Sequence, residues 1–140
     1  MSGAENDAVA RWRGAQAPSL DDIAALAEDA FARLPETFRS LCEGVVFVVE
    51  EFADDETLDS LGIESEYDLL GLYHGVAISH DDGMRADANR IHLYRRALID
   101  YWAEYDETFD HLVTHVLVHE IGHHVGLSDD QMEYIENSVR

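Results

Sequence analysis

The sequence predicts one small α+β domain in which a three-stranded sheet packs on helices. The chain has 140 residues, 46% of them hydrophobic, which is enough for a single core. Apolar residues recur at helical spacing in three segments, and three short runs between the first and second of these have the composition of strands. The order helix, strand, strand, strand, helix, helix indicates a layer of strands covered by helices.

The N-terminal part is predicted to divide into a lead-in and the start of the domain. Residues 1–18 are small and polar, so we expect a flexible lead-in, followed by one domain over residues 19–140. Ser19 and Asp22 have the spacing of a capping box at the start of the first helix. An apolar stripe follows at helical spacing, and Pro35 ends the helix.

Three segments in the middle of the chain are predicted to be strands. The β-branched run GVVFVVEEF at 44–52 is typical of a buried strand. YDLLGLYHGVAIS at 67–79 forms a second strand region, and RIHLYRR at 90–96 alternates as a third strand would. The acidic piece ADDETLDSLG at 53–62 is expected to be a loop or a single helical turn.

Two helices are predicted to complete the domain. The first is a long helix over about residues 107–125, which Gly126 ends as a left-handed cap. Ser128 and Gln131 form a second capping box, which opens a short C-terminal helix through about Ser138.

The long helix carries a pattern that predicts a metal site. His119 and His123 are four residues apart, so both imidazoles lie on nearly one face and can reach one ion. Glu120 lies beside them, where a carboxylate can take a proton from a bound water. Because Gly126 breaks the helix, the chain can turn back and Asp129 can offer an oxygen as third ligand. We therefore predict one Zn²⁺ per chain held by His119, His123 and Asp129, with Glu120 as the catalytic base.

Other residues near this pattern have more ordinary expected roles. His111 is predicted to lie at the surface, His115 to support the ligands from behind, and His124 to pack or lie at the surface. Gly122 gives room for close approach by a strand or a substrate. Met132 is either a core residue or a floor beneath the metal.

The composition excludes several classes of partner. Thirty acidic and nine basic residues give a formal charge of −21, which repels phosphate backbones and anionic lipids. We therefore expect no nucleic-acid and no membrane partner. The chain has one cysteine, Cys42, no secretory signal and no spanning segment, so we expect a cytoplasmic protein.

The segment HEIGHHVGLSD resembles the zincin metallopeptidases, and within them the metzincin-type pattern with aspartate as third ligand. More closely, the chain resembles a small bacterial zincin-like metallopeptidase family with a minimal matrix-metalloprotease-like fold. LLGLYHGVAIS, RIHLYRRALID and VLVHEIGHHVGLSDDQME look like the three blocks of that family in the same order. The gluzincin arrangement, with a glutamate ligand on a later helix, fits less well, because only 17 residues follow His123 and their only glutamates are Glu133 and Glu136.

The resemblance and the residues both imply a zinc-dependent peptidase that hydrolyses peptide bonds by a metal-activated water, with a glutamate general base. The partner is then a peptide or protein substrate, which could lie along an edge strand provided by residues 71–78 or 90–95. A chain this short has no lower subdomain to wall the cleft. We therefore expect either weak catalysis or a protein partner that completes the cleft.

The alternative is a non-enzymatic binding module that a structural zinc stabilises. Such a clamp would close its fourth coordination position, and His124, Asp130 or Glu133 could do so. Glu120 discriminates between the two hypotheses, because a closed clamp has no use for a carboxylate beside the metal.

Overall fold

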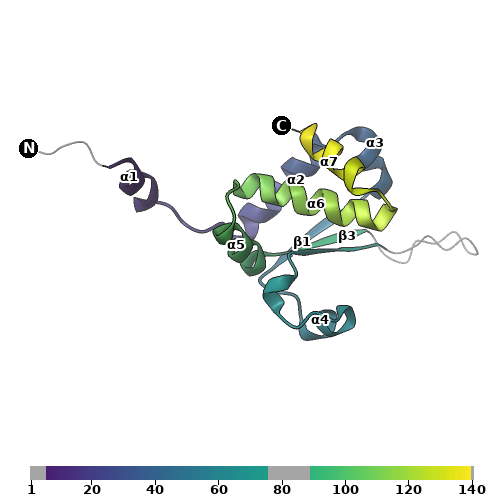
Figure 1. The fold of residues 1–140 in the computed structure, drawn as a ribbon, viewed down its shortest axis with the longest axis horizontal. Coiled ribbons are helices and arrows are strands. Elements are labelled where there is room, and N and C mark those ends of the chain that lie inside the picture. The colour runs from purple at the N-terminus through teal and green to yellow at the C-terminus, as the bar shows by residue number, and fades with distance from the viewer. Residues whose placement is uncertain (1–5, 76–88, 140) are drawn as a thin grey trace, which may run out of the picture.

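The structure is a computed structural model that describes residues 6–75 and 89–139 (Figure 1). This part of the chain forms seven α-helices, two short 3₁₀ segments and one three-stranded sheet, which confirms the predicted α+β class. The elements in chain order are α1 (Asp7–Arg13), α2 (Leu20–Arg33), α3 (Glu36–Arg39), η1 (Ser40–Cys42), β1 (Val46–Glu50), α4 (Asp55–Leu61), η2 (Glu66–Asp68), β2 (Gly71–His74), β3 (Arg90–Tyr94), α5 (Arg95–Glu104), α6 (Phe109–Val125) and α7 (Asp129–Asn137).

The third strand in the sequence lies at the centre of the sheet. The strand order is β1-β3-β2, with β3 parallel to β1 and antiparallel to β2. Ile91 and Leu93 of β3 are both fully buried. The expectation of a buried first strand is wrong, because β1 lies at an edge and Val46 is 47% exposed. On the face of the sheet toward α2, Phe47 packs edge-on against Phe31, with ring centroids 5.8 Å apart.

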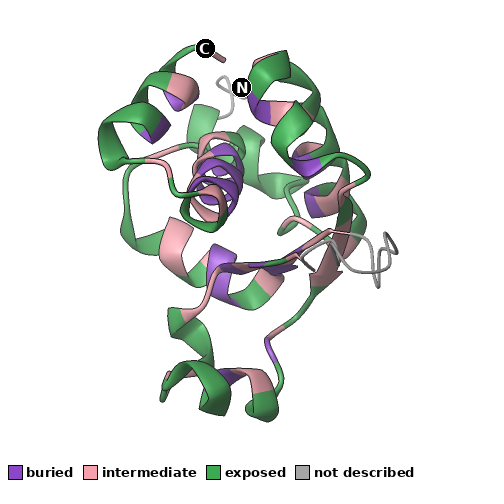
Figure 2. Cartoon of the chain, turned by 90° about the vertical axis from the view of Figure 1, so that its right-hand side faces the viewer, coloured by how far each residue is buried: buried purple, intermediate pink, exposed green. Residues whose placement is uncertain are grey.

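Helices α2 and α6 lie together on one face of the sheet and enclose the main core (Figure 1). Figure 2, which looks along α6, shows this helix buried at most positions and ringed by other elements. Its buried residues are Phe109, Leu112, Val113, Thr114, Val116, Leu117, Val118, Ile121 and Gly122. The predicted long helix is thus confirmed, with Thr108 as its N-cap.

Four helices add to the predicted order: α1, the four-residue α3, α4 and α5. Residues 55–61 form α4, longer than the expected loop or single turn, because Asp54 caps its start and Gly62 closes it at φ +70°. Its Leu58 packs beneath the other face of the sheet with Tyr94 in a second, smaller cluster. The sequence pattern also missed α5, which follows β3 without a loop.

The three helix caps that the sequence predicts are confirmed. Both capping boxes, Ser19 with Asp22 and Ser128 with Gln131, have their reciprocal hydrogen bonds. Gly126 has φ +82°, a left-handed conformation that glycine adopts without strain. This turn reverses the chain, so α7 lies beside α6.

The predicted lead-in contains a helix that its composition did not indicate. Figure 1 shows α1 standing away from the other elements, and none of its residues is buried. Trp12 is 57% exposed. The division into a flexible lead-in and a domain over residues 19–140 stays a prediction. Among the described residues, no helix has both the length and the apolar character needed to cross a membrane.

Candidate metal centre

The return of α7 along α6 fixes the surroundings of the histidine row. After the turn at Gly126, the Leu127 N–H donates to the Gly122 carbonyl at 2.8 Å. Met132 of α7 is fully buried and packs on Gly122, where an added Cβ would lie only 2.3 Å from the Met132 sulfur. The space at Gly122 therefore serves helix packing, and not the strand or substrate expected from the sequence. Met132 is a core residue.

A buried carboxylate of α7 meets two histidines of α6. Glu136 is 8% exposed, and its two oxygens lie 2.7 Å from His115 Nδ1 and 3.3 Å from His119 Nε2. One ligand atom from each of the three residues lies within 4.8 Å of the others. Neutral imidazoles and carboxylates are zinc ligands, so the donor set at this place can hold a metal ion.

The environment of His119 favours the form that binds metal. Burial lowers the pKa of His119, and the neighbouring His115 lowers it further, while Glu136 acts in the opposite direction. A lowered pKa keeps the imidazole neutral at neutral pH, and only a neutral imidazole has the free lone pair that a metal needs.

The predicted ligands are not all assembled. The His119 and His123 rings lie edge to face with centroids 5.7 Å apart, and His123 is exposed. Asp129 is the first residue of α7 and is also exposed. Neither His123 nor Asp129 belongs to the group of three ligand atoms within 4.8 Å, in which His119 meets Glu136.

The sequence predicts a supporting role for His115 and offers Glu136 only for the gluzincin arrangement. A signal for both was present in the spacing. His115 precedes His119 by four residues, and Glu136 follows Asp129 by seven, so each lies on nearly the same helix face as its counterpart. Residue types alone could not indicate which carboxylate of α7 reaches the histidines.

Glu120 faces the sheet and not α7. Its Oε1 accepts a hydrogen bond from the Tyr73 N–H of strand β2 at 3.3 Å. Burial raises the pKa of Glu120, while the Tyr73 N–H and His123 lower it. His124 packs on the Tyr73 ring, with centroids 4.0 Å apart, in agreement with its expected packing role. Glu120 is therefore a partly desolvated carboxylate held between α6 and the sheet.

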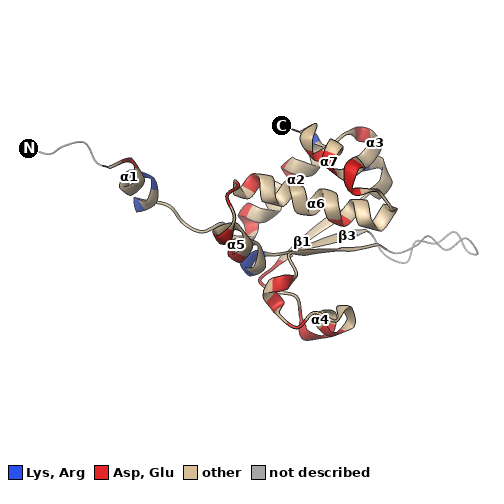
Figure 3. Ribbon diagram, viewed as in Figure 1, with Lys and Arg blue, Asp and Glu red and all other residues tan. Residues whose placement is uncertain are grey.

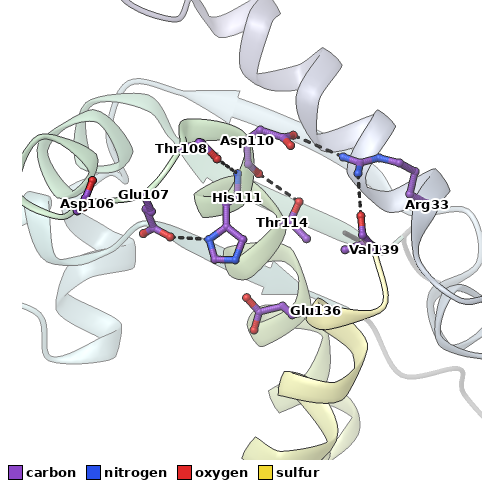
Figure 4. A pocket seen from close by; sticks show the side chains of 9 residues that line it. All are labelled: Arg33, Asp106, Glu107, Thr108, Asp110, His111, Thr114, Glu136 and Val139. Carbon is purple, nitrogen blue, oxygen red and sulfur yellow. Dashed lines mark hydrogen bonds and ion pairs between the residues drawn. The ribbon is translucent and has the colours of Figure 1, made fainter.

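His111, the first histidine of the row, lies at a cavity of about 560 Å³ (Figure 4), and Glu120 is not among the residues that line it. His111, expected at the surface, is partly buried, and its Nδ1 lies 2.8 Å from Glu107 of the preceding turn. Thr114 and Glu136 also line this cavity. One side of the His115–His119–Glu136 group is thus reached from an open space.

The sequence over this whole region matches a known family. The family profile described as zincin-like metallopeptidase aligns with residues 42–139, which is more than half of the chain. The chain belongs to the zincin-like metallopeptidase family. The match includes β1, β2 and β3 and both helices of the metal centre. A comparison with curated proteins finds no match.

Membership of the zincin-like metallopeptidases implies zinc, and the donor chemistry of the site agrees with it. The residues that could close a structural clamp lie outside this group of three ligand atoms. His124 packs on Tyr73, and Asp130 and Glu133 are exposed.

Proposed function

We propose that the protein is a zinc-dependent peptidase in which His119, His123 and Asp129 hold the ion and Glu120 is the general base. Family membership supports the metallopeptidase class. The His119–His123 spacing on α6 supports the two nitrogen ligands, and the turn at Gly126 brings Asp129 to the start of α7. Asp129 would complete the set after His119 turns away from Glu136.

The observation that carries this proposal is the position of Glu120. Glu120 directly follows His119 on α6, and its carboxylate accepts a hydrogen bond from the Tyr73 N–H of strand β2. Partial burial of a carboxylate costs free energy, and a glutamate that only covers the surface avoids this cost by staying in water. The partly buried position of Glu120 therefore indicates a role for its carboxylate. A general base needs this fixed position at the place where the substrate backbone would pass.

Strand β2 offers the edge along which a peptide would bind. Of the two candidate segments from the sequence, 90–95 contains β3, which is central and has a partner on each side. The segment 71–78 therefore remains, of which the structure describes residues 71–75 with β2, while 76–78 lie outside the described residues. The Leu70 carbonyl accepts from the Tyr94 N–H, so backbone groups of alternate residues point toward β3. Those of Gly71 and Tyr73 point outward, and because the Tyr73 N–H donates to Glu120, the Gly71 groups and the Tyr73 carbonyl are left for a peptide. No strand among residues 6–75 and 89–139 pairs with this edge. A peptide substrate would add there as a further strand.

When bound, zinc lowers the pKa of a water molecule and polarises a carbonyl group. Glu120 accepts one proton from the attacking water while the water oxygen forms a bond to the scissile carbonyl carbon. When the carbon–nitrogen bond breaks, Glu120 returns the proton to the leaving amine. The Tyr73 N–H holds one carboxylate oxygen, which leaves the other to face the water. A pKa raised by burial makes this carboxylate a stronger base than an exposed glutamate.

The charge of the molecule favours certain substrates. Acidic residues are distributed over α4, α5 and α7 (Figure 3), and the formal charge is −21. An acidic surface attracts basic peptides and repels acidic ones. We therefore propose a neutral or basic peptide or protein segment as substrate, in the cytoplasm. We also propose that a protein partner completes the wall of the cleft. Nucleic acids and membranes are not partners in this proposal.

The experiment that tests the function compares wild type with Glu120→Gln on a broad peptide library, each protein loaded with zinc. Gln keeps the shape and the acceptor for Tyr73 but loses the basicity. We expect wild type to cleave some peptides and Glu120→Gln to cleave them at least about a hundredfold more slowly. Equal rates on a cleaved peptide would remove Glu120 from the mechanism. Zinc binding without cleavage of any peptide would favour the binding module with a structural zinc.

A further inference from the structure

We propose that His115, His119 and Glu136 form a divalent-metal site of their own, which we call the inner site. It lies one helical turn from the catalytic set of His119, His123 and Asp129, which we call the outer site. The two sites share His119. A neutral imidazole has one lone pair, so His119 serves one ion at a time and the sites exclude each other.

The geometry of the inner site comes from two helices that run in opposite directions. On α6 the inner pair repeats the spacing of the outer pair, since His115 precedes His119 by the same four residues that separate His119 from His123. Of the four carboxylates of α7, the two assigned to these sites, Asp129 and Glu136, are seven residues apart, which is two helical turns. The proposal therefore gives the inner pair Glu136 and the outer pair Asp129, two turns apart on the returning helix.

The inner site is nearly formed without any ion. Glu136 is 8% exposed and offers one oxygen to each imidazole, and the three ligand atoms lie within 4.8 Å of one another. In a tetrahedral zinc site, ligand atoms about 2.1 Å from the ion stand roughly 3.4 Å apart. Shifts of about an ångström in the side chains would bring the inner site to this geometry. The outer site requires His119 to change its partner.

A neighbouring pair shows why the inner site is more than a histidine beside an acid. His111 Nδ1 lies 2.8 Å from Glu107, a distance similar to that between His115 and Glu136. Glu107 lies four residues before His111 in the same segment of chain, whereas Glu136 comes from a different helix than His115. Among the described residues, no second imidazole joins His111 and Glu107 in a group of three ligand atoms. The pair His111–Glu107 is therefore a matched control with one imidazole and one carboxylate.

Occupancy of the inner site has a consequence for activity, and this part rests on the proposed function. An ion held by His115, His119 and Glu136 takes His119 away from His123 and leaves Glu120 beside an incomplete set. The share of zinc held at the inner site would then be inactive, and because the two sites exclude each other this share would not change with the zinc concentration. Glu136 lines the cavity shown in Figure 4, which gives an ion a route to the inner site that does not pass Glu120.

The test measures zinc binding to the full chain, without any peptide. In His123→Ala/Asp129→Asn the outer site is removed, and we expect this variant still to bind about one zinc per chain in a calorimetric titration. Adding Glu136→Gln or His115→Asn to it should weaken binding at least about tenfold, whereas adding His111→Asn should change nothing. With Co²⁺ as probe, titrations followed by the visible absorption of the bound ion should rank the affinities of these variants in the same order.

Two results would overturn the inner site. One is that His123→Ala/Asp129→Asn binds zinc no more tightly than His119→Ala, which removes both sites. Glu136 would then only orient His119 from behind. The other is that Glu136→Gln and His111→Asn have equal effects. Circular dichroism checks the fold of each variant, and His123→Asn alone replaces the double variant if the latter is unfolded. Because the experiment measures zinc binding, its result does not depend on whether the protein cleaves peptides.

Discussion

Glu120 of α6 and Tyr73 of β2 are joined by a hydrogen bond of 3.3 Å from the Tyr73 N–H to the carboxylate, across 47 residues of sequence. This bond ties the proposed base to the edge strand along which a peptide would bind. The structural role of the Glu120 side chain can therefore be separated from its basicity by comparing Glu120→Gln, which keeps the acceptor for Tyr73, with Glu120→Ala, which removes it.

Glu120→Gln should fold at least as stably as wild type in the absence of metal, because it removes a partly buried charge and keeps the acceptor for Tyr73. Glu120→Ala leaves the Tyr73 N–H without its acceptor and should lose about 1–2 kcal/mol of unfolding free energy. Urea denaturation of the chelator-treated proteins measures both. If the two variants are equally stable, the bond to Tyr73 contributes nothing.

Zinc should stabilise the folded chain, since the ligands come together only in the fold. At a free zinc concentration one hundred times the Kd, the gain is about 2.7 kcal/mol, provided that the unfolded chain binds no zinc. The thermal midpoint should rise with added zinc and fall again with a chelator. His119→Ala should abolish the shift, because both the outer and the inner site use this residue. An undiminished shift in His119→Ala would place the ion elsewhere.

Gly122→Ala should destabilise the protein by about 1–3 kcal/mol, because the new Cβ would lie 2.3 Å from the Met132 sulfur and 2.7 Å from its Cγ. Pushing α7 away from α6 should also weaken zinc binding. Gly14→Ala is the matched control, since nothing lies within 4 Å of its added Cβ. Denaturation curves and zinc titrations of the two variants check the contrast, and similar losses in both would contradict it.

Stability should fall in alkali because of Cys42. Burial raises the pKa of this fully buried thiol from 9.0 to about 11. Above pH 9 the unfolded chain ionises first, so stability is present below pH 9 and is lost as the pH rises to about 11. The loss from Cys42 is about 2–3 kcal/mol for a shift of this size.

Cys42→Ala separates this effect from other groups. Burial raises the pKa of Tyr94 to about 12, so this residue also makes the unfolding free energy depend on pH, and it does so equally in wild type and in the variant. The difference in unfolding free energy between wild type and Cys42→Ala should therefore narrow between pH 8 and 11. A constant difference would show that the thiol ionises equally in both states.

Local signals in the sequence determined most of the elements. The capping boxes at Ser19 and Ser128 and the glycine at 126 fix helix ends through bonds within a few residues, so they can be read directly. The helix α5 was missed because the strand pattern was continued through Arg96, and because the helix starts directly after β3 with no cap bond from a side chain.

By itself, the sequence determined the fold class, the long histidine-bearing helix and the position of Glu120 next to His119, because each depends on periodicity or spacing along one element. Only the tertiary structure decided that β3 is central, that Met132 fills the space at Gly122, and that Glu136 reaches His115 and His119. These relationships depend on how two elements pack. Asp129, Glu133 and Glu136 all lie on α7 as carboxylates, and the rotation of α7 against α6, set by the packing of Met132 on Gly122, selects which of them is buried among the histidines.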